Sequence, residues 1–113
     1  MTGGRSGREL SDAALELVAD RFRALGEPNR LRLIRALAGG ERNVSELIKA
    51  TGLAQANVSR HLGVLTDAGI LGRRKEGLSA YYHIADRSIL DLCRQVCGSL
   101  EKRIERQTGL FGK

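Results

Sequence analysis

The chain has 113 residues, enough for one domain with a modest core. Hydrophobic residues make up 42 % of the sequence and charged residues 28 %, a mixture that excludes wholesale disorder. Lys and Arg number 19 against 13 Asp and Glu, and the net charge of +6 favours a polyanionic partner, either DNA or a membrane surface.

The sequence carries no signal for membrane insertion or export. No apolar run approaches the roughly 20 residues of a membrane span, and the polar start MTGGRSGREL lacks the apolar core of a signal peptide. Two cysteines are too few for the disulfide framework of a secreted protein. We therefore expect a cytoplasmic protein with no membrane partner, in which both cysteines are available as thiols.

The first 40 residues predict a flexible arm and two helices. Residues 1–10 are rich in glycine and polar side chains and form the arm. Ser11 has the character of an N-cap, and apolar residues at helical spacing predict a first helix over residues 12–25. Pro28 suits the first turn of a second helix, which ends at a double glycine. This second helix is expected to turn its arginines outward, toward phosphate or solvent: Arg30, Arg32 and Arg35.

Residues 44–70, VSELIKATGLAQANVSRHLGVLTDAGI, predict a helix-turn-helix. A first short helix ends at the Thr51-Gly52-Leu53 break, and a second begins near Ala54 with apolar residues at spacings of four and three. The N-terminal residues of such a recognition helix read base edges. The polar candidates for DNA contact gather there: Gln55, Asn57, Ser59, Arg60 and His61. For His61, a hydrogen bond inside the domain is an equal alternative.

After the recognition helix the periodicity changes to that of strands. Residues 70–75 and 79–84 predict a β-hairpin with Gly77 at its tip. A hairpin beside a recognition helix is the wing of a winged helix, whose cations track phosphates or enter the minor groove. The candidates are Arg73, Arg74, Lys75 and Tyr81, since strand alternation leaves only one of the two tyrosines outside. A solubilising edge hairpin is the alternative.

The last helix is expected over residues 88–107, followed by a tail over residues 108–113. Its apolar stripe is longer than a small domain needs: Ile89, Cys93, Val96, Leu100 and Ile104. Pairing of this stripe and the first helix with a second copy would bury it around a two-fold axis. Such a homodimer would place two recognition helices about 34 Å apart, matching a palindromic operator. The predicted fold class is therefore mostly α with a small β-hairpin wing, a winged helix-turn-helix of five helices in a DNA-binding and dimerisation domain over residues 11–107.

Three segments, EPNRLRLI, NVSRHLGVL and AGIL, together resemble the ArsR/SmtB family of winged-helix repressors, and the resemblance extends over residues 10–106. It implies a homodimeric bacterial repressor whose operator affinity falls when an inducer binds, often a metal or metalloid ion. The positions matching the family's DNA-facing helix are Gln55, Asn57, Ser59, Arg60 and His61, and those matching its wing are Arg73 and Arg74.

The sequence departs from two metal sites of that family. Members that sense arsenite or cadmium in the helix before the turn carry Cys-x-Cys there, where this chain has Asn43-Val44-Ser45. Members that sense zinc on the last helix use histidine, which this helix lacks. It carries instead Cys93 and Cys97, which become the candidate inducer site.

Residues four apart on a helix have Cβ atoms about 5 to 6 Å apart, so the sulfurs of Cys93 and Cys97 could bind one ion. Thiolates select soft ions, here arsenite, cadmium, zinc or copper(I). Further ligands would come from Asp91, His83, water or a partner's cysteines. Plain packing of the thiols and a redox or reactive-sulfur sensor are the alternatives at this site. An inducer-independent winged-helix module for DNA binding or protein interaction is the alternative for the whole chain. No catalytic motif or required cofactor is evident, so we expect no enzyme.

Overall fold

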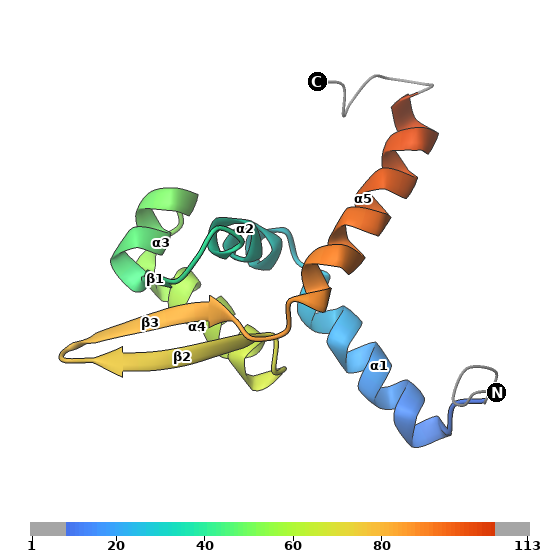
Figure 1. The fold of residues 1–113 in the computed structure, drawn as a ribbon, viewed down its shortest axis with the longest axis horizontal. Coiled ribbons are helices and arrows are strands. Elements are labelled where there is room, and N and C mark those ends of the chain that lie inside the picture. The colour runs from blue at the N-terminus through green and yellow to red at the C-terminus, as the bar shows by residue number, and fades with distance from the viewer. Residues whose placement is uncertain (1–8, 106–113) are drawn as a thin grey trace.

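The computed structural model describes residues 9–105, in which five helices surround a three-stranded antiparallel sheet (Figure 1). The predicted winged helix-turn-helix is confirmed. Most of the predicted arm, the last two predicted helical residues and the tail lie outside the described residues. The helices are α1 (Asp12–Leu25), α2 (Pro28–Leu37), α3 (Val44–Thr51), α4 (Gln55–Asp67) and α5 (Ser88–Glu105), and the strands are β1 (Arg42–Asn43), β2 (Leu71–Glu76) and β3 (Ser79–Ile84).

Local sequence signals set most of the element ends. The hydroxyl of Ser11 accepts the N–H of Ala14 at 3.1 Å and caps α1. Pro28 occupies the first turn of α2. Gly52 ends α3 with a φ of +74°, a left-handed conformation that glycine adopts without steric cost. The helix-turn-helix boundary therefore follows directly from the residue types.

The core lies where α2, α3 and α4 meet the base of the sheet. Its members are apolar side chains withdrawn from water: Leu33, Leu37, Leu47, Val58, Leu62, Leu65 and Ile70. They come from positions that repeat at helical spacing, so each helix buries one stripe and leaves a polar face outside. This packing fixes the position of α4 relative to the sheet, so the two form one rigid body.

The two-residue strand β1 is not predictable from the sequence. Arg42 and Asn43 pair with Tyr82 and Tyr81 of β3, which gives the sheet the order β1-β3-β2. Two residues are too short to show any alternation of apolar and polar side chains. The pairing connects the start of α3 to the base of the wing.

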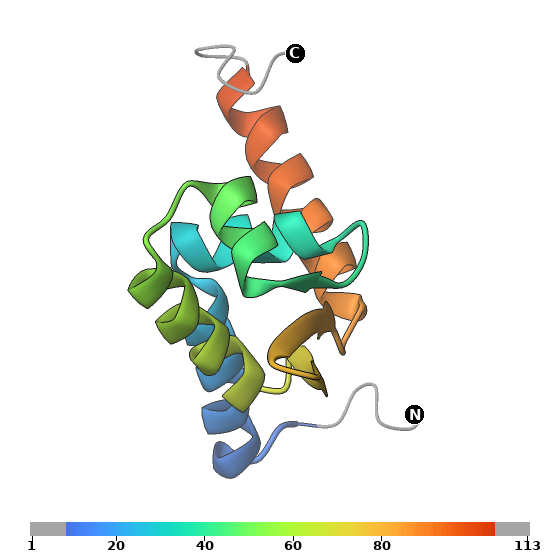
Figure 2. The ribbon, with the colours of Figure 1, turned by 90° about the vertical axis from the view of Figure 1, so that its left-hand side faces the viewer.

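The helices α1 and α5 project from the end of the molecule opposite the wing tip (Figure 1), and α5 rises away from the core when the view is turned (Figure 2). Both carry large apolar side chains that remain exposed: Leu15, Leu17, Val18 and Phe22 on α1, and Val96 and Leu100 on α5. Their exposure leaves an apolar surface larger than the core of one chain can cover. Among residues 9–105, no helix is both long and apolar enough to span a membrane.

Candidate nucleic-acid interface and thiol pair

The recognition helix α4 separates its polar and apolar residues as the sequence predicted. Val58, Leu62 and Leu65 are buried in the core. Four of the five polar candidates are exposed along the first half of the helix: Gln55, Asn57, Ser59 and Arg60. Arg60 donates to the Oδ1 of Asn57 at 3.3 Å, one turn away. These side chains form a continuous polar face of the kind that reads base edges.

The prediction that His61 faces DNA is wrong, because its side chain is only 2 % exposed. Its Nδ1 lies 3.2 Å from the Nη1 of Arg30, and its Nε2 lies 3.8 Å from the Oε1 of Glu27. Arginine has no acceptor, and a neutral ring can accept at only one nitrogen; the contact of Arg30 with Nδ1 at 3.2 Å is shorter than that of Arg60 with Nε2 at 3.5 Å, which favours Nδ1 as the acceptor and a proton on Nε2. The alternative of a hydrogen bond inside the domain is the one found. Arg30, expected to point outward, is thus engaged within the fold.

Burial lowers the pKa of His61, and the neighbouring charges of Arg60 and Arg30 act in the same direction. The carboxylate of Glu27 opposes them. At neutral pH the ring is therefore uncharged, which suits its position beside two guanidinium groups.

On the wing, Arg74 is held by acidic residues and does not present a free cation. Its Nε and Nη2 donate to the two carboxylate oxygens of Glu41 at 3.0 and 2.8 Å, and its Nη1 donates to Glu76 at 2.5 Å. The same guanidinium lies 4.9 Å from the ring centre of Tyr81. Hydrogen bonds from Arg74 lower the pKa of Glu41, while those carboxylates raise the pKa of Arg74. This network joins the wing to the turn before β1.

The remaining wing candidates lie on different faces of the hairpin. Arg73 pairs across the strands with Tyr82, and Arg74 pairs with Tyr81. Tyr82 packs against the core and accepts a hydrogen bond from Arg73 at 3.2 Å. The prediction that one tyrosine points inward is therefore confirmed, and Tyr81 is the outer one. Arg73 and Lys75 are both exposed.

Because Arg74 is already neutralised by two carboxylates, we expect Arg73 to make the phosphate contact of this pair. Arg73→Ala should lower the salt dependence of DNA binding by about one unit in the slope of log K against log salt. Arg74→Ala should leave that slope unchanged. Both slopes come from fluorescence anisotropy titrations at several salt concentrations, and a flatter slope in Arg74→Ala alone would contradict the assignment.

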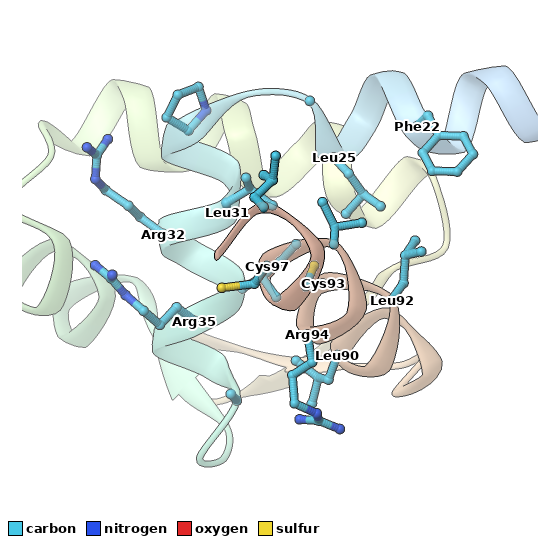
Figure 3. A pocket seen from close by; sticks show the side chains of 16 residues that line it. Phe22, Leu25, Leu31, Arg32, Arg35, Leu90, Leu92, Cys93, Arg94 and Cys97 are labelled. Atoms are coloured by element: carbon cyan, nitrogen blue, oxygen red, sulfur yellow. The ribbon is translucent and has the colours of Figure 1, made fainter. Parts of the chain in front are cut away.

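A groove of about 780 Å³ lies between α1, α2 and α5. Its walls are mostly apolar, and both cysteines line it (Figure 3). The thiol of Cys97 points toward α2 (Figure 3). Cys93 lies one turn earlier on α5 and packs against the core. Three arginines also line the groove: Arg32 and Arg35 from α2 and Arg94 from α5.

The chemistry of this groove offers sulfur but few other metal ligands. Burial raises the pKa of Cys93, whereas Cys97 is exposed. The carboxylate of Asp91 pairs with Arg94, and His83 lies on the wing with its ring packed over Gly72. Within residues 9–105, no three His, Cys, Asp or Glu side chains gather into a metal site. One described chain therefore brings two thiols to the groove.

A family model described as bacterial regulatory protein, arsR family, matches residues 27–72. The "Probable mercury resistance operon repressor" of Streptomyces lividans is 38 % identical over 71 residues, which are 63 % of this chain and 57 % of that repressor. This chain thus matches little more than half of the repressor's length.

Two solved structures share the fold and cover more of the chain. The crystal structure of Mycobacterium tuberculosis Rv0081 has a TM-score of 0.76 and 32 % identity, and covers 86 % of this chain and 98 % of its own. The solution structure of the homodimeric winged helix-turn-helix DNA-binding domain of Mb0332 from Mycobacterium bovis has a TM-score of 0.75 and 32 % identity, with coverage of 96 % and 97 %. The chain therefore belongs to the ArsR family of bacterial regulatory proteins.

Proposed function

We propose that this chain is a homodimeric transcriptional repressor that binds operator DNA in the cytoplasm and leaves it when a thiophilic ion binds Cys93 and Cys97. The observation that carries the DNA-binding part is the exposed polar face at the start of α4, beside a wing that presents Arg73 and Lys75. The net charge of +6 supports attraction to DNA. Family membership makes regulation of transcription the natural role of this interface.

Dimerisation is supported by the exposed apolar faces of α1 and α5. Leu17 is 71 % exposed and Phe22 is 54 % exposed. Large apolar side chains exposed together on two helices are unusual for a monomeric protein and mark an interaction surface. The M. bovis relative is a homodimer of the same fold. A two-fold axis through these helices would place two copies of α4 against successive major grooves.

The two thiols support an ion that needs few ligands. Copper(I) and mercuric ions are soft and accept two thiolates, and Cys93 and Cys97 supply two from adjacent turns of one helix. Zinc takes four ligands, so zinc would require ligands from the partner chain as well. The S. lividans relative is named for mercury resistance, which favours the same class of ion.

Ion binding at this position can alter DNA affinity because the groove lies between the helices expected at the dimer seam and α2, which packs against α4. Binding of both sulfurs to one ion would fix the two cysteine side chains and change the packing of α5 against α1 and α2. A change in the angle between protomers would then move the two recognition helices out of register with the operator. A coupling free energy of about 1 to 3 kcal/mol is typical of such switches.

A redox or reactive-sulfur sensor is the second candidate, favoured by the exposed thiol of Cys97 beside the groove arginines. A disulfide within the helix is disfavoured because its Cβ atoms must come to about 3.8 Å, closer than helical spacing provides. Oxidation would therefore produce a bridge between protomers or a capped thiol.

The proposal is tested by titrating the protein bound to its own promoter with mercuric ion, copper(I), arsenite, cadmium, zinc and polysulfide. We expect mercuric ion or copper(I) to release the wild type, and the Cys93→Ser/Cys97→Ser variant to stay bound. Because Cys93 and Cys97 are the two cysteines of the sequence, the double variant has no thiol and serves as a complete control. Release by polysulfide alone would favour the redox sensor. Equal responses of variant and wild type would eliminate thiol sensing, and equal affinity for random DNA would favour an architectural module.

A further inference from the structure

A single arginine of α1 joins the end of the recognition helix to the start of α5. The Nη2 of Arg21 donates to the backbone oxygen of Ala68, the C-cap of α4, at 3.1 Å. Its Nη1 donates to the Oδ2 of Asp86 at 2.9 Å, two residues before α5 begins. Three elements that are far apart in the sequence therefore meet on one guanidinium.

The groups around Arg21 make this junction rigid. Asp86 also accepts the backbone N–H and the hydroxyl of Ser88, at 3.1 and 2.6 Å, so its carboxylate holds the first turn of α5 as well. The backbone oxygen of Ile70 accepts the N–H groups of Ala85 and Asp86. Hydrogen bonds from Ser88 and Arg21 lower the pKa of Asp86, which keeps it ionised at neutral pH.

A second arginine fixes α4 nearer its middle. Arg30 donates to the backbone oxygen of Ala24 at 2.6 Å, at the end of α1, and reaches Nδ1 of His61 in α4 at 3.2 Å. The helices α1 and α4 lie side by side (Figure 2), so these contacts tie α4 to α1 at two points along its length. The orientation of α4 is thus set from the helix that carries the exposed apolar face.

We infer that Arg21 is a positioning residue that fixes the separation of the two recognition helices, and hence the half-site spacing that the dimer accepts on DNA. The inference rests on the proposed DNA-binding homodimer but not on the sensing of an ion by thiols. Arg21 lies on α1 and its guanidinium is engaged by Ala68 and Asp86, so we assign it to holding the end of α4 and not to contacting bases. Loss of the two hydrogen bonds of Arg21 leaves base reading intact and lets the body formed by α4 and the sheet tilt relative to α1.

The test is selection of duplexes from a random DNA library by the full chain, carried out with the wild type, Arg21→Ala and Asp86→Asn. Arg23→Ala is the matched control, because Arg23 lies two residues away on α1 and, within residues 9–105, its side chain pairs with Asp20 one turn away on the same helix. We expect the wild type and the control to select paired half-sites at one spacing. Arg21→Ala should select the same half-site over a broader range of spacings, and Asp86→Asn should do so to a smaller extent.

The selected duplex with one base pair inserted between its half-sites gives the quantitative measure. One base pair turns one half-site by about a tenth of a helical turn relative to the other. We expect the insertion to lower wild-type affinity at least about tenfold and the affinity of Arg21→Ala less than about threefold. A structural role alone would lower affinity for both duplexes equally.

The outcomes distinguish failure of the proposed dimeric repressor from failure of the inference about Arg21. If the wild type selects no paired half-sites, the dimeric repressor itself is wrong. If it does, and Arg21→Ala keeps the wild-type spacing or loses the half-site sequence, the inference about Arg21 alone is overturned. Should Arg21→Ala fail to fold, Asp86→Asn decides in the same way, because it retains an oxygen for Ser88 and weakens the bond to Arg21.

Discussion

Val96→Glu combined with Leu100→Glu is expected to convert the protein to monomers and to weaken operator binding about 100- to 10,000-fold, the gain that linking two binding modules provides. Both side chains are exposed on α5, at 49 % and 42 %, and neither belongs to the core. The substitution should therefore leave the fold of each chain intact, while four carboxylates at the seam of a dimer would repel one another.

The matched control is Gln95→Glu combined with Ser99→Glu, which adds the same charge at the same spacing on polar, exposed positions of α5. We expect the control to remain dimeric in sedimentation velocity and to keep most of its DNA affinity. A Val96→Glu/Leu100→Glu protein that sediments as a dimer would place the dimer interface elsewhere on the chain.

The free energy of unfolding is expected to fall between pH 7.5 and pH 5.5 because of His61. Its pKa in the folded protein is lowered by burial and by the charge of Arg60, whereas in the unfolded chain it titrates near 6.5. Below that value the unfolded chain binds more protons than the folded one, so stability decreases as the pH falls. The slope approaches at most about 1.4 kcal/mol per pH unit and ends at the folded pKa.

Urea denaturation across this pH range measures the effect. In His61→Asn, whose amide oxygen can replace Nδ1 as the acceptor for Arg30, we expect the slope to be largely lost. In His83→Gln, which alters an exposed ring on the wing, the slope should remain. Glu27, Glu41 and Asp86 have lowered pKa values and contribute only at more acidic pH. An unchanged slope in His61→Asn would contradict the role of the histidine.

The architecture could be predicted because its determinants are local in sequence. Ser11, Pro28 and Gly52 mark helix ends through their own chemistry, and each helix repeats apolar residues at its own spacing. The hairpin followed from a change of period and a glycine at its tip. These signals were sufficient for the order of the five helices and the hairpin, including the recognition helix and the wing, but not for β1.

The corrections concern contacts between residues far apart in the chain. Arg74 donates a hydrogen bond to Glu41, 33 residues away in the sequence, and Arg30 contacts His61, 31 residues away. Spacing along one helix cannot show which neighbouring element covers a polar side chain, so it left His61 open between contact with DNA and a hydrogen bond inside the domain. One nearby signal was overlooked: Asn43 and Glu46 form a capping box at the start of α3.

The thiol pair illustrates the same limit. Its helical spacing predicted two sulfurs on adjacent turns, and both line one groove. Of the candidate further ligands, Asp91 is paired with Arg94 and His83 lies on the wing. Under the proposed sensing, two thiolates from one described chain suit a two-coordinate ion, whereas a four-ligand ion would need ligands from the partner as well.

The proposed sensing of a thiophilic ion by Cys93 and Cys97 is tested most directly by adding mercuric ion stoichiometrically to the wild-type protein bound to its promoter and following its release by fluorescence anisotropy. We expect loss of DNA binding that is complete near one ion per chain and is reversed by excess competing thiol. Undiminished DNA binding after both thiols of every chain have taken up mercuric ion would contradict it.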